Sequence, residues 1–409
     1  MKMNFKKLTI SLSGFILCLI AITLTKFPQK DERAKYIFLF IGDGMGHSLI
    51  SLTESYMSYK AGKVGGERLT FSNFPYSGNV STYSIDSPVT CSAAAGTAIA
   101  SGKKTINTRV GRDENNAEAR SFAFDLKADG YKVGIITNAP INHATPACFY
   151  SCPEERFNYH EITRSIPESG FDFFGGCGFL QFFNPSDGDT DSETYLENNG
   201  YKVCWGREEF DGTLPDADKI VLCNKENQGG DAKNYNADGS WSPENFTLDE
   251  MVRNSLRFFG EETPFFIMCE GGTIDWAAHV NRTMPTIKLI MEMDEAVKAA
   301  YEFYKKHPDE TLIIVTADHD TGGASVGYGP KWINDQPKWH ILDSAWNASG
   351  QKNDLGEKEN KKLNDDAFIG WTTYYHTGAD VPVFAIGKGA EQFCGKMDNT
   401  DFRAKILAE

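Results

Sequence analysis

Residues 36–46 read Tyr-Ile-Phe-Leu-Phe-Ile-Gly-Asp-Gly-Met-Gly, and this stretch decides the fold. The run from Tyr36 to Gly42 is apolar and ends at a glycine, which is typical of a central parallel strand buried on both faces. Because helical patterns separate this run from later ones, the sequence predicts an α/β fold with a doubly wound, mostly parallel central sheet and helices on both faces. Similar apolar runs recur at Val133–Thr137, Phe265–Cys269, Thr311–Thr316 and Val383–Ile386.

Two helical patterns between these runs have clear signals. The first begins at the capping box Thr247-Leu-Asp-Glu250 and stops at Gly260. Its inward face is expected to consist of Met251, Val252, Ser255 and Phe259. The second has an apolar stripe at helical spacing, formed by Leu289, Met293, Val297 and Ala300.

Two stretches interrupt the alternation of strands and helices. Residues 165–245 are rich in Gly, Asn and Asp, and we expect a long insertion on the rim of the sheet. Within it, the acidic run from Asp187 to Ser192 lacks the spacing and closing glutamate of a calcium loop, so a solvated loop is favoured. Residues 328–370 form a second polar insertion, whose tryptophans we expect to cover the site or face a partner subunit: Trp332, Trp339 and Trp346, with Trp371 just beyond.

The chain has 409 residues and a net charge of −15, which argues against nucleic acid as a partner. Three lysines (Lys2, Lys6 and Lys7) precede an apolar run from Leu8 to Leu24, so residues 1–27 are predicted to be a secretory signal peptide or an uncleaved N-terminal anchor. We therefore expect a periplasmic or secreted protein in which residues 28–409 form a single domain with the two insertions.

The cysteines of the chain are candidates for disulfides or for free thiols. Eight follow Cys18, and in an exported protein some of them are expected to pair, with Cys148–Cys152 or Cys204–Cys223 as candidates. Two others adjoin residues of chemical interest in apolar surroundings and are expected to be free, buried thiols: Cys91 and Cys269. No C-x-x-C pair occurs, so a cysteine zinc site is not expected.

The stretch from Ser87 to Gly102 is rich in small residues, and its part from Ser92 to Ser101 predicts a helix that begins at a serine. Free N–H groups and a partial positive charge at a helix N-terminus suit an anion such as phosphate. A hydroxyl placed there could attack phosphorus if its pKa were lowered. The alternative is a buried packing helix that Ser92 merely caps.

Acidic and imidazole groups follow the buried runs. Asp43, Glu270 and the pair Asp318-His319 each come directly after one of them, at the sheet edge where open α/β sheets bind ligands. Mixed carboxylate and imidazole ligands suit zinc and magnesium, and each group alone could instead be a helix cap or a core residue. Further candidates are Asp275 and His279, four residues apart and so on one side of a helical turn, and His376.

Six motifs of the chain, between about Tyr36 and Gly387, resemble those of alkaline phosphatases in the order of that family. The resemblance implies a sandwich-like α/β fold, a homodimer, two zinc ions and one magnesium ion. The motifs are Asp43-Gly-Met-Gly, Thr90-Cys-Ser-Ala-Ala-Ala-Gly-Thr-Ala, Asn142-His-Ala-Thr-Pro146, Glu270-Gly-Gly-Thr-Ile-Asp275 with His279, Thr316-Ala-Asp-His319 and Tyr375-His-Thr-Gly378.

The resemblance also implies roles for single residues. Ser92 corresponds to the nucleophile, and Arg156, eleven residues after Thr145, corresponds to the arginine that binds phosphate. The first zinc ion would be bound by Asp275, His279 and His376. The second would be bound by Asp43, Asp318, His319 and Ser92, and the magnesium ion by Asp43, Thr145 and Glu270.

Three positions depart from the family pattern. Cys91 replaces the usual aspartate that holds the arginine, while His143 and Trp276 stand near the expected phosphate site. The leading interpretation is an alkaline phosphatase that acts on small phosphate monoesters. The alternatives are a phosphodiesterase of the same superfamily and a non-catalytic zinc-binding protein, whereas a sulfatase is disfavoured because Ser92 is not followed by that class's proline and arginine.

Overall fold

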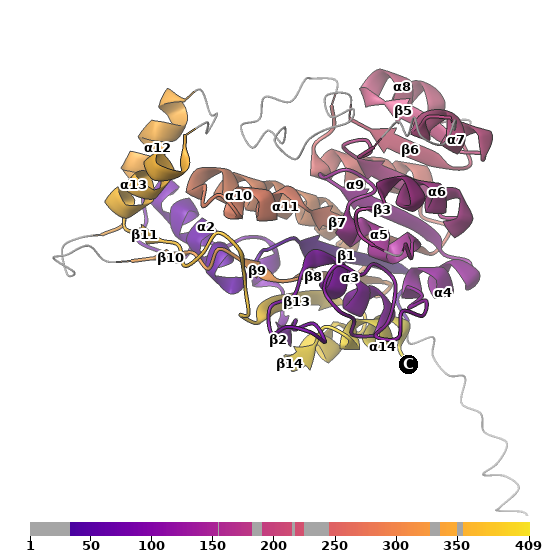
Figure 1. Ribbon diagram of the computed structural model, residues 1–409, viewed down its shortest axis with the longest axis horizontal. Coiled ribbons are helices and arrows are strands. Elements are labelled where there is room, and N and C mark those ends of the chain that lie inside the picture. Colours follow the sequence, from indigo (N-terminus) through magenta and orange to yellow (C-terminus); the bar gives the residue numbers. More distant parts are fainter. Residues whose placement is uncertain are drawn as a thin grey trace, which may run out of the picture. The chain divides into compact units, whose positions relative to one another are not determined.

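A ten-stranded sheet lies at the centre of the computed structural model, which describes residues 33–153, 155–181, 190–214, 217–224, 245–327, 336–349 and 355–409 (Figure 1). Only β13 runs antiparallel to the other strands of this sheet, so the predicted, mostly parallel arrangement is confirmed. Across the sheet the order is β14 (Gly395–Asp398), β2 (Tyr76–Ser81), β13 (Val381–Gly387), β8 (Thr311–Ala317), β1 (Tyr36–Gly42), β7 (Phe265–Gly271), β3 (Lys132–Thr137), β4 (Phe173–Gly176), β6 (Ile220–Cys223) and β5 (Lys202–Trp205).

Helices cover both faces of this sheet. On β7, Phe266 contacts rings of α4 and α5, whereas its neighbour Phe265 contacts rings of α9 and α11. Because successive side chains of a strand point to opposite faces, these helix pairs lie on opposite sides. The helices are α2 (His47–Lys60), α3 (Ser92–Ser101), α4 (Phe122–Ala128), α5 (Ala144–Tyr150), α6 (Tyr159–Ser169), α7 (Ser192–Asn198), α8 (Gly206–Thr213), α9 (Leu248–Phe259), α10 (Thr273–Ala278), α11 (Thr283–Tyr304), α12 (Trp339–Ala348), α13 (Glu357–Ala367) and α14 (Asp401–Leu407).

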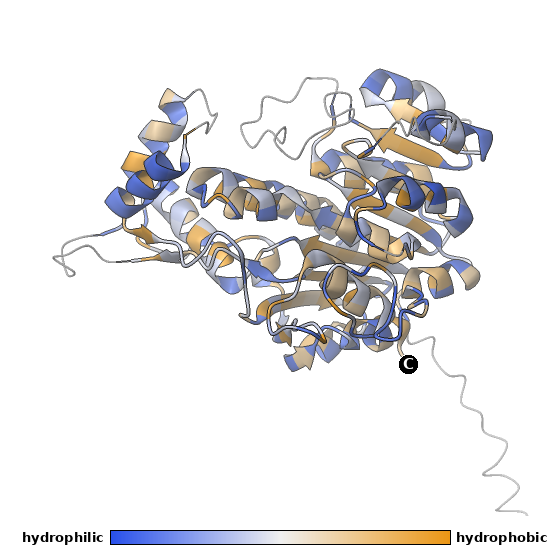
Figure 2. Ribbon diagram, in the orientation of Figure 1, coloured by the Kyte–Doolittle hydropathy of each residue, from blue (hydrophilic) through white to orange (hydrophobic). Residues whose placement is uncertain are grey.

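The central strands are the most apolar part of the protein, as Figure 2 shows. Every residue of β1, β7 and β8 is buried. Gly42 of β1 lies opposite Gly271 of β7 and Ala317 of β8, so the three strands end at one level. This common register carries the residues that follow β1 and β8 to the same edge of the sheet.

The helical patterns formed as predicted. The capping box at Thr247 opens α9, and Gly260 is its C-cap. The four predicted inward residues of α9 are buried, and so is the whole predicted stripe of α11.

The stretch 165–245 lies on the rim of the sheet, as expected, but it forms part of the sheet rather than only loop. It supplies β4, β5 and β6, which extend the sheet at one edge, with α6, α7 and α8 between or beside them. Each of these strands has only four residues, which is too short for the apolar run to be distinctive in the sequence. The acidic residues 187–189 lie outside the described residues, and Asp191 caps α7 by accepting a bond from the Thr194 amide.

The second polar stretch contributes α12, α13 and a short strand, β11 (Ile369–Gly370), that pairs with β10 (Ser325–Val326). Trp339 and Trp346 are buried there, and the Trp339 ring packs 5.6 Å from that of Tyr56 in α2. The expectation that they face the site or a partner was therefore wrong: they form a local core. Trp371 donates a hydrogen bond to Thr283 Oγ1 at 3.0 Å, while Trp332 lies outside the described residues.

The eight cysteines after Cys18 are all described and all free, so both expected disulfides are wrong. Cys204 lies opposite Leu222, the residue before Cys223, so the two thiols point to opposite faces of the sheet. The thiol of Cys148 instead donates to carbonyls of Ala93 and Ala144. Cys269 is buried as expected, but Cys91 is only partly buried.

Residues 1–32, which include most of the predicted signal segment, lie outside the described residues. Among the helices that the structure does describe, none combines the length and apolar character needed to cross a membrane.

Candidate active site

Helix α3 places Ser92 at its first position, as predicted. Cys91, the N-cap residue, makes no side-chain hydrogen bond to the helix, and the Ala95 amide is the first to bond back, to the Cys91 carbonyl at 3.0 Å. The amides of the first turn therefore remain available to an anion. Ser92 is only 3% exposed, and its Oγ lies 3.2 Å from His319 Nε2.

A first group of candidate ligands consists of Asp275, His279 and His376. His279 Nε2 lies 3.3 Å from Asp275 Oδ2, and His376 Nε2 lies 3.6 Å from Asp275 Oδ1 and 3.1 Å from His279 Nε2. The other ring nitrogens face backbone carbonyls, His279 Nδ1 that of Tyr374 at 2.6 Å and His376 Nδ1 that of Thr90 at 2.8 Å. Protons on both Nδ1 atoms would leave both Nε2 lone pairs pointing into one small space, as in metal-binding histidines.

A second group forms around His319. Its Nε2 lies 3.3 Å from Asp43 Oδ1 and 3.4 Å from Asp318 Oδ2, and all three residues are fully buried. Asp275 also offers an oxygen to the group of Asp43 and His319, so it adjoins both sets of ligands. Asp318 is held in place through its Oδ1, which accepts hydrogen bonds from the amides of Gly44 and His319.

A third group consists of Asp43, His143 and Glu270, whose ligand atoms lie within 4.8 Å of one another. Glu270 accepts a hydrogen bond from Thr137 through Oε2, and Thr145 is fully buried in the first turn of α5. The sequence placed His143 beside the substrate and left open its effect on the identity of the third metal, and the structure brings its ring into this group. Its position two residues before Thr145, at the N-cap of α5, was the signal that its ring could also reach this group.

Several polar atoms of these groups are buried and have no hydrogen bond. They include both oxygens of Asp43, Glu270 Oε1, Thr145 Oγ1, Asp318 Oδ2 and His143 Nδ1. Leaving such atoms unpaired is costly, and buried carboxylates normally pair or coordinate metal. The donor set therefore fits divalent cations, with oxygen and imidazole ligands suited to zinc or magnesium.

The carboxylates also disturb one another electrostatically. Burial raises the pKa of Asp318 to about 8, with Asp275 adding to the effect, and burial raises the pKa of Glu270 to about 7. The pKa of Asp43 rises well above its usual range through burial and the charge of Asp318. So many carboxylates cannot all ionise in one buried space unless cations neutralise them.

Burial lowers the pKa values of His319 and His376, and it lowers that of His143 to about 3. These rings are therefore neutral near pH 7, which is the form that binds metal. Asp275 behaves differently from the other carboxylates: burial alone would raise its pKa, but its hydrogen bond with His279 and the nearby imidazoles outweigh burial and lower it.

Arg156 lies close enough to lower the pKa values of Asp43 and Glu270. It follows the short loop after α5, and its backbone amide donates to the Thr108 carbonyl at 3.2 Å. Among the described residues its guanidinium has no ion pair, and its Nε is buried without a hydrogen bond. Cys91, at the position of the family's aspartate, accepts a bond from the Thr108 amide instead.

Trp276 lies on α10 beside Asp275, and its ring meets that of His143 edge-on at 5.6 Å. One residue that sequence reasoning missed is Thr321. Its hydroxyl donates to Asp275 Oδ1 at 2.6 Å and lies 3.2 Å from His319 Nδ1, so it connects the first two ligand groups. Thr321 pairs with His376 between the short strands β9 (Asp320–Thr321) and β12 (His376–Thr377).

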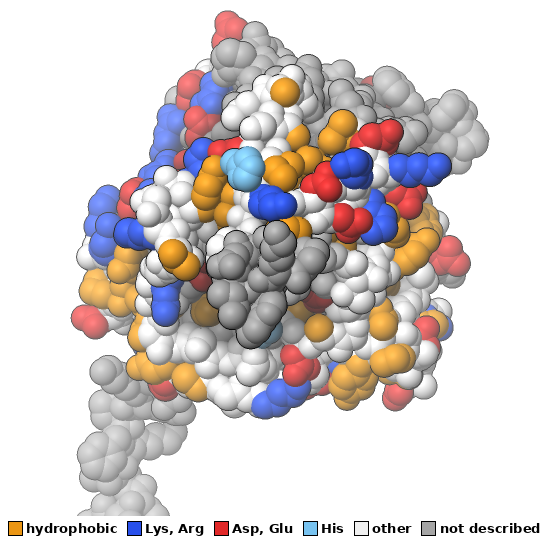
Figure 3. Space-filling model, turned by 90° about the vertical axis from the view of Figure 1, so that its left-hand side faces the viewer, with side chains coloured by type: hydrophobic (Ala, Val, Ile, Leu, Met, Phe, Trp, Pro, Cys, Tyr) orange, Lys and Arg blue, Asp and Glu red, His pale blue; other side chains and the backbone are white. Residues whose placement is uncertain are grey.

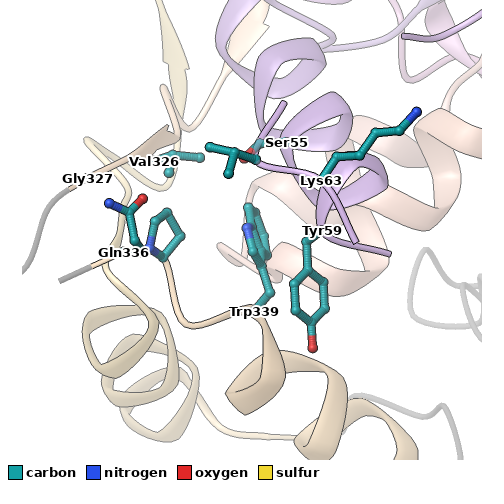
Figure 4. A pocket seen from close by; sticks show the side chains of 9 residues that line it. Ser55, Tyr59, Lys63, Val326, Gly327, Gln336 and Trp339 are labelled. Carbon is teal, nitrogen blue, oxygen red and sulfur yellow. The ribbon is translucent and has the colours of Figure 1, made fainter. Parts of the chain in front are cut away.

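A separate cavity of about 510 Å³ lies between the end of α2, β10 and the start of α12 (Figure 4). Tyr59, Lys63 and Trp339 are among its lining residues, and it shares none with the Ser92 site. On the face that contains α12 and α13, side chains of both charges are interspersed without a continuous basic surface (Figure 3). The reactive groups of the described residues gather at the sheet edge instead.

Comparisons with known proteins identify the family of the chain. The family model described as alkaline phosphatase matches residues 34–180 and 186–408. Alkaline phosphatase 4 of Bacillus subtilis is 30% identical over 93% of this chain and 89% of its own. The solved structure of alkaline phosphatase from the Antarctic bacterium TAB5 is 28% identical, has a TM-score of 0.73, and covers 92% of this chain and 97% of that one.

A histidine-to-glutamate mutant of the TAB5 enzyme is described with Mg bound in its M3 site; it is 27% identical, has a TM-score of 0.72 and covers 92% of this chain and 97% of that one. With a family model that spans nearly all of the sequence, a curated relative 30% identical and a fold that agrees with them, the chain belongs to the alkaline phosphatase family and is a phosphomonoesterase.

Proposed function

We propose that this protein is an exported alkaline phosphatase that hydrolyses small phosphate monoesters through a phosphoserine at Ser92. The observation that carries the proposal is the position of Ser92 Oγ, at the N-terminus of α3 and 3.2 Å from His319 Nε2. Ser92 thus stands at a helix N-terminus beside His319, a residue of the second group of candidate metal ligands.

Three cations fit the ligand groups. Asp275, His279 and His376 would hold one zinc ion, and Asp43, Asp318, His319 and Ser92 a second. Asp43, Thr145 and Glu270 would hold magnesium. When bound, these ions would lower the pKa of the attacking hydroxyl and neutralise the charge of the phosphate and leaving group.

The residues of the chain have distinct tasks in this reaction. Ser92 Oγ attacks phosphorus in line, so the ester bond breaks as the Oγ–P bond forms. The amides of the first turn of α3 and the guanidinium of Arg156 bind the equatorial oxygens, where negative charge is spread in the transition state. Water then attacks the phosphoserine, which releases phosphate and restores the hydroxyl.

The third group differs from an all-oxygen site because His143 adds an imidazole to it. Nitrogen ligands favour transition metals over magnesium. We therefore propose that this position accepts zinc as well as magnesium.

The test compares p-nitrophenyl phosphate with bis-p-nitrophenyl phosphate at alkaline pH, with and without a chelator. We expect fast, chelator-sensitive turnover of the monoester. Ser92→Ala should lose about 1,000-fold or more in kcat yet retain bound metal, whereas Ser101→Ala, at the other end of the same helix, should remain active. Equal or faster diester turnover would instead identify a phosphodiesterase, and absence of both activities in a metal-loaded protein would identify a non-catalytic zinc-binding protein.

Export and a homodimer are part of this proposal. They rest on the basic and apolar N-terminal sequence and on the resemblance to the family, respectively. Cell fractionation with N-terminal sequencing of the mature protein tests the first, and light scattering tests the second.

A further inference from the structure

Large apolar side chains border one part of the site. Among the described residues, only six large hydrophobic side chains are strongly exposed, and two of them directly adjoin candidate ligands of the first group: Val280, 40% exposed, follows His279, and Tyr375, 72% exposed, precedes His376. Single exposed apolar residues are ordinary, but their position next to two ligands of one group is not.

Val280 follows the end of α10. The helix ends at Ala278, and the His279 amide still donates to the Asp275 carbonyl at 2.8 Å, so His279 and Val280 come directly after the last helical residue. Trp276, also on α10, is not part of this surface, because its ring faces that of His143 in the third group.

Tyr375 completes the surface from the other segment. Its ring lies 6.4 Å from the His279 ring at an angle of 76°. Its backbone is held on both sides, because its amide donates to Thr373 Oγ1 at 3.2 Å and its carbonyl accepts from the Gly322 amide at 3.0 Å. The exposed ring thus stands on an anchored backbone rather than on a free loop.

We infer that Val280 and Tyr375, which adjoin two ligands of the first group, form an apolar ledge that binds the organic part of the substrate. The inference rests on the proposed function: if Ser92 attacks phosphorus and the ion held by Asp275, His279 and His376 receives the leaving group, the organic group departs beside these two residues. An alcohol with an aromatic or extended apolar group would cover the ledge and remove its surface from water. The favoured substrates are therefore aromatic or apolar phosphate monoesters.

The test uses 2-phenylethyl phosphate and ethyl phosphate, which share a primary alkyl leaving group and differ in the phenyl ring. We expect the wild-type enzyme to have a kcat/KM about 10-fold higher for the phenyl substrate. Tyr375→Ala and Val280→Ala should each lower this ratio about 3- to 5-fold, and Tyr375→Phe should preserve it. Val64→Ala, which changes a 98% exposed valine beyond the end of α2, serves as the control and should leave the ratio as it is.

A ratio near one in the wild-type enzyme, or a ratio that none of the ledge variants changes, would overturn the inference while leaving the phosphatase assignment intact. A change of oligomeric state in Tyr375→Ala without a change in the ratio would overturn it in favour of a contact between copies of the chain. If neither ester were hydrolysed, the proposed function would fail. The ledge would then be tested by calorimetric titration with phenylethylphosphonate and ethylphosphonate, where equal affinities would reject it and tighter binding of the phenyl compound would support it.

Discussion

Two buried aspartates of this protein, Asp294 and Asp43, differ in the number of hydrogen bonds that their carboxylates accept. Asp294, in α11, accepts three hydrogen bonds, from the Thr70 amide and hydroxyl, both at 2.9 Å, and from the Phe71 amide at 3.3 Å. Asp43, at the end of β1, is fully buried, yet neither of its oxygens accepts a hydrogen bond. A structural carboxylate is satisfied by the fold, whereas Asp43 faces a space that only a ligand of positive charge can satisfy.

The clearest test of this difference replaces Asp43 and Asp294 separately by asparagine, which removes the charge of each side chain. Asp43→Asn should lower kcat/KM by about 1,000-fold, because Asp43 adjoins two groups of candidate metal ligands, and the loss corresponds to several kcal/mol of transition-state stabilisation. Asp294→Asn should remain active but lose about 1–3 kcal/mol of unfolding free energy, with or without chelator. Steady-state kinetics and thermal melts in both conditions measure these effects, and an active Asp43→Asn enzyme would contradict the assignment.

The second prediction concerns pH and the metal-free protein. The pKa values of Asp318 and Glu270 are raised by burial to about 8 and 7 in the folded state, while in the unfolded chain such groups titrate near pH 4. Between these values the folded state holds more protons at the two carboxyl groups, so their contribution to stability falls as pH rises. The buried histidines, whose pKa values are lowered, have the opposite effect below about pH 6.5, where the unfolded chain binds more protons. With chelator, the unfolding free energy should therefore decrease above about pH 6.5, by about 1.4 kcal/mol per pH unit for Asp318 up to about pH 8 and for Glu270 up to about pH 7.

With zinc and magnesium present this decrease should disappear, because the ligands must be ionised to bind the ions. Urea titrations at several pH values, with and without metal, provide the measurement. A chelated protein whose unfolding free energy increases between about pH 6.5 and pH 8 would show that the pKa values of these carboxyl groups are not raised in the folded state.

A smaller effect is expected at Thr321, which connects the ligand groups. Thr321→Val keeps the shape but removes the hydroxyl that donates to Asp275 Oδ1, so the two ligands lose orientation. We expect about a 10-fold loss of zinc affinity or kcat, and recovery of most of it in Thr321→Ser. Zinc competition with a fluorescent chelator measures affinity directly, and a Thr321→Val protein with unaltered affinity would reject this positioning role.

The matched change in the other region has the smallest effect. Thr70→Val removes one of the three hydrogen bonds of Asp294 and should cost about 1 kcal/mol of unfolding free energy. Activity and metal content should stay as in the wild-type protein. If Thr70→Val altered metal binding, the division between a structural and a ligand-binding carboxylate would not hold.

The fold could be predicted where the sequence has a clear hydrophobic pattern or helix-capping signal. The continuous apolar run of β1 and the capping box of α9 specify their elements locally, and both formed at the predicted residues. The four-residue strands β4, β5 and β6 were not predicted. Their sequences are too short to show a strand pattern, and they are extended because they pair with neighbouring strands of the sheet. The failed disulfide predictions have a similar cause, since the register that turns Cys204 away from Cys223 is set by the sheet.

Residue types and their order were enough to predict a sheet, a helix beginning at a reactive serine, and a supply of carboxylate and imidazole groups after buried strands. They were enough because periodicity, caps and strand ends are properties of neighbouring residues. Which of those groups share a space was decided by folding: the common register of β1, β7 and β8, the approach of His143 to Glu270, and the bond from Thr321 to Asp275 join residues far apart in the chain. Such proximity depends on packing across the whole sheet, and a linear pattern does not contain it.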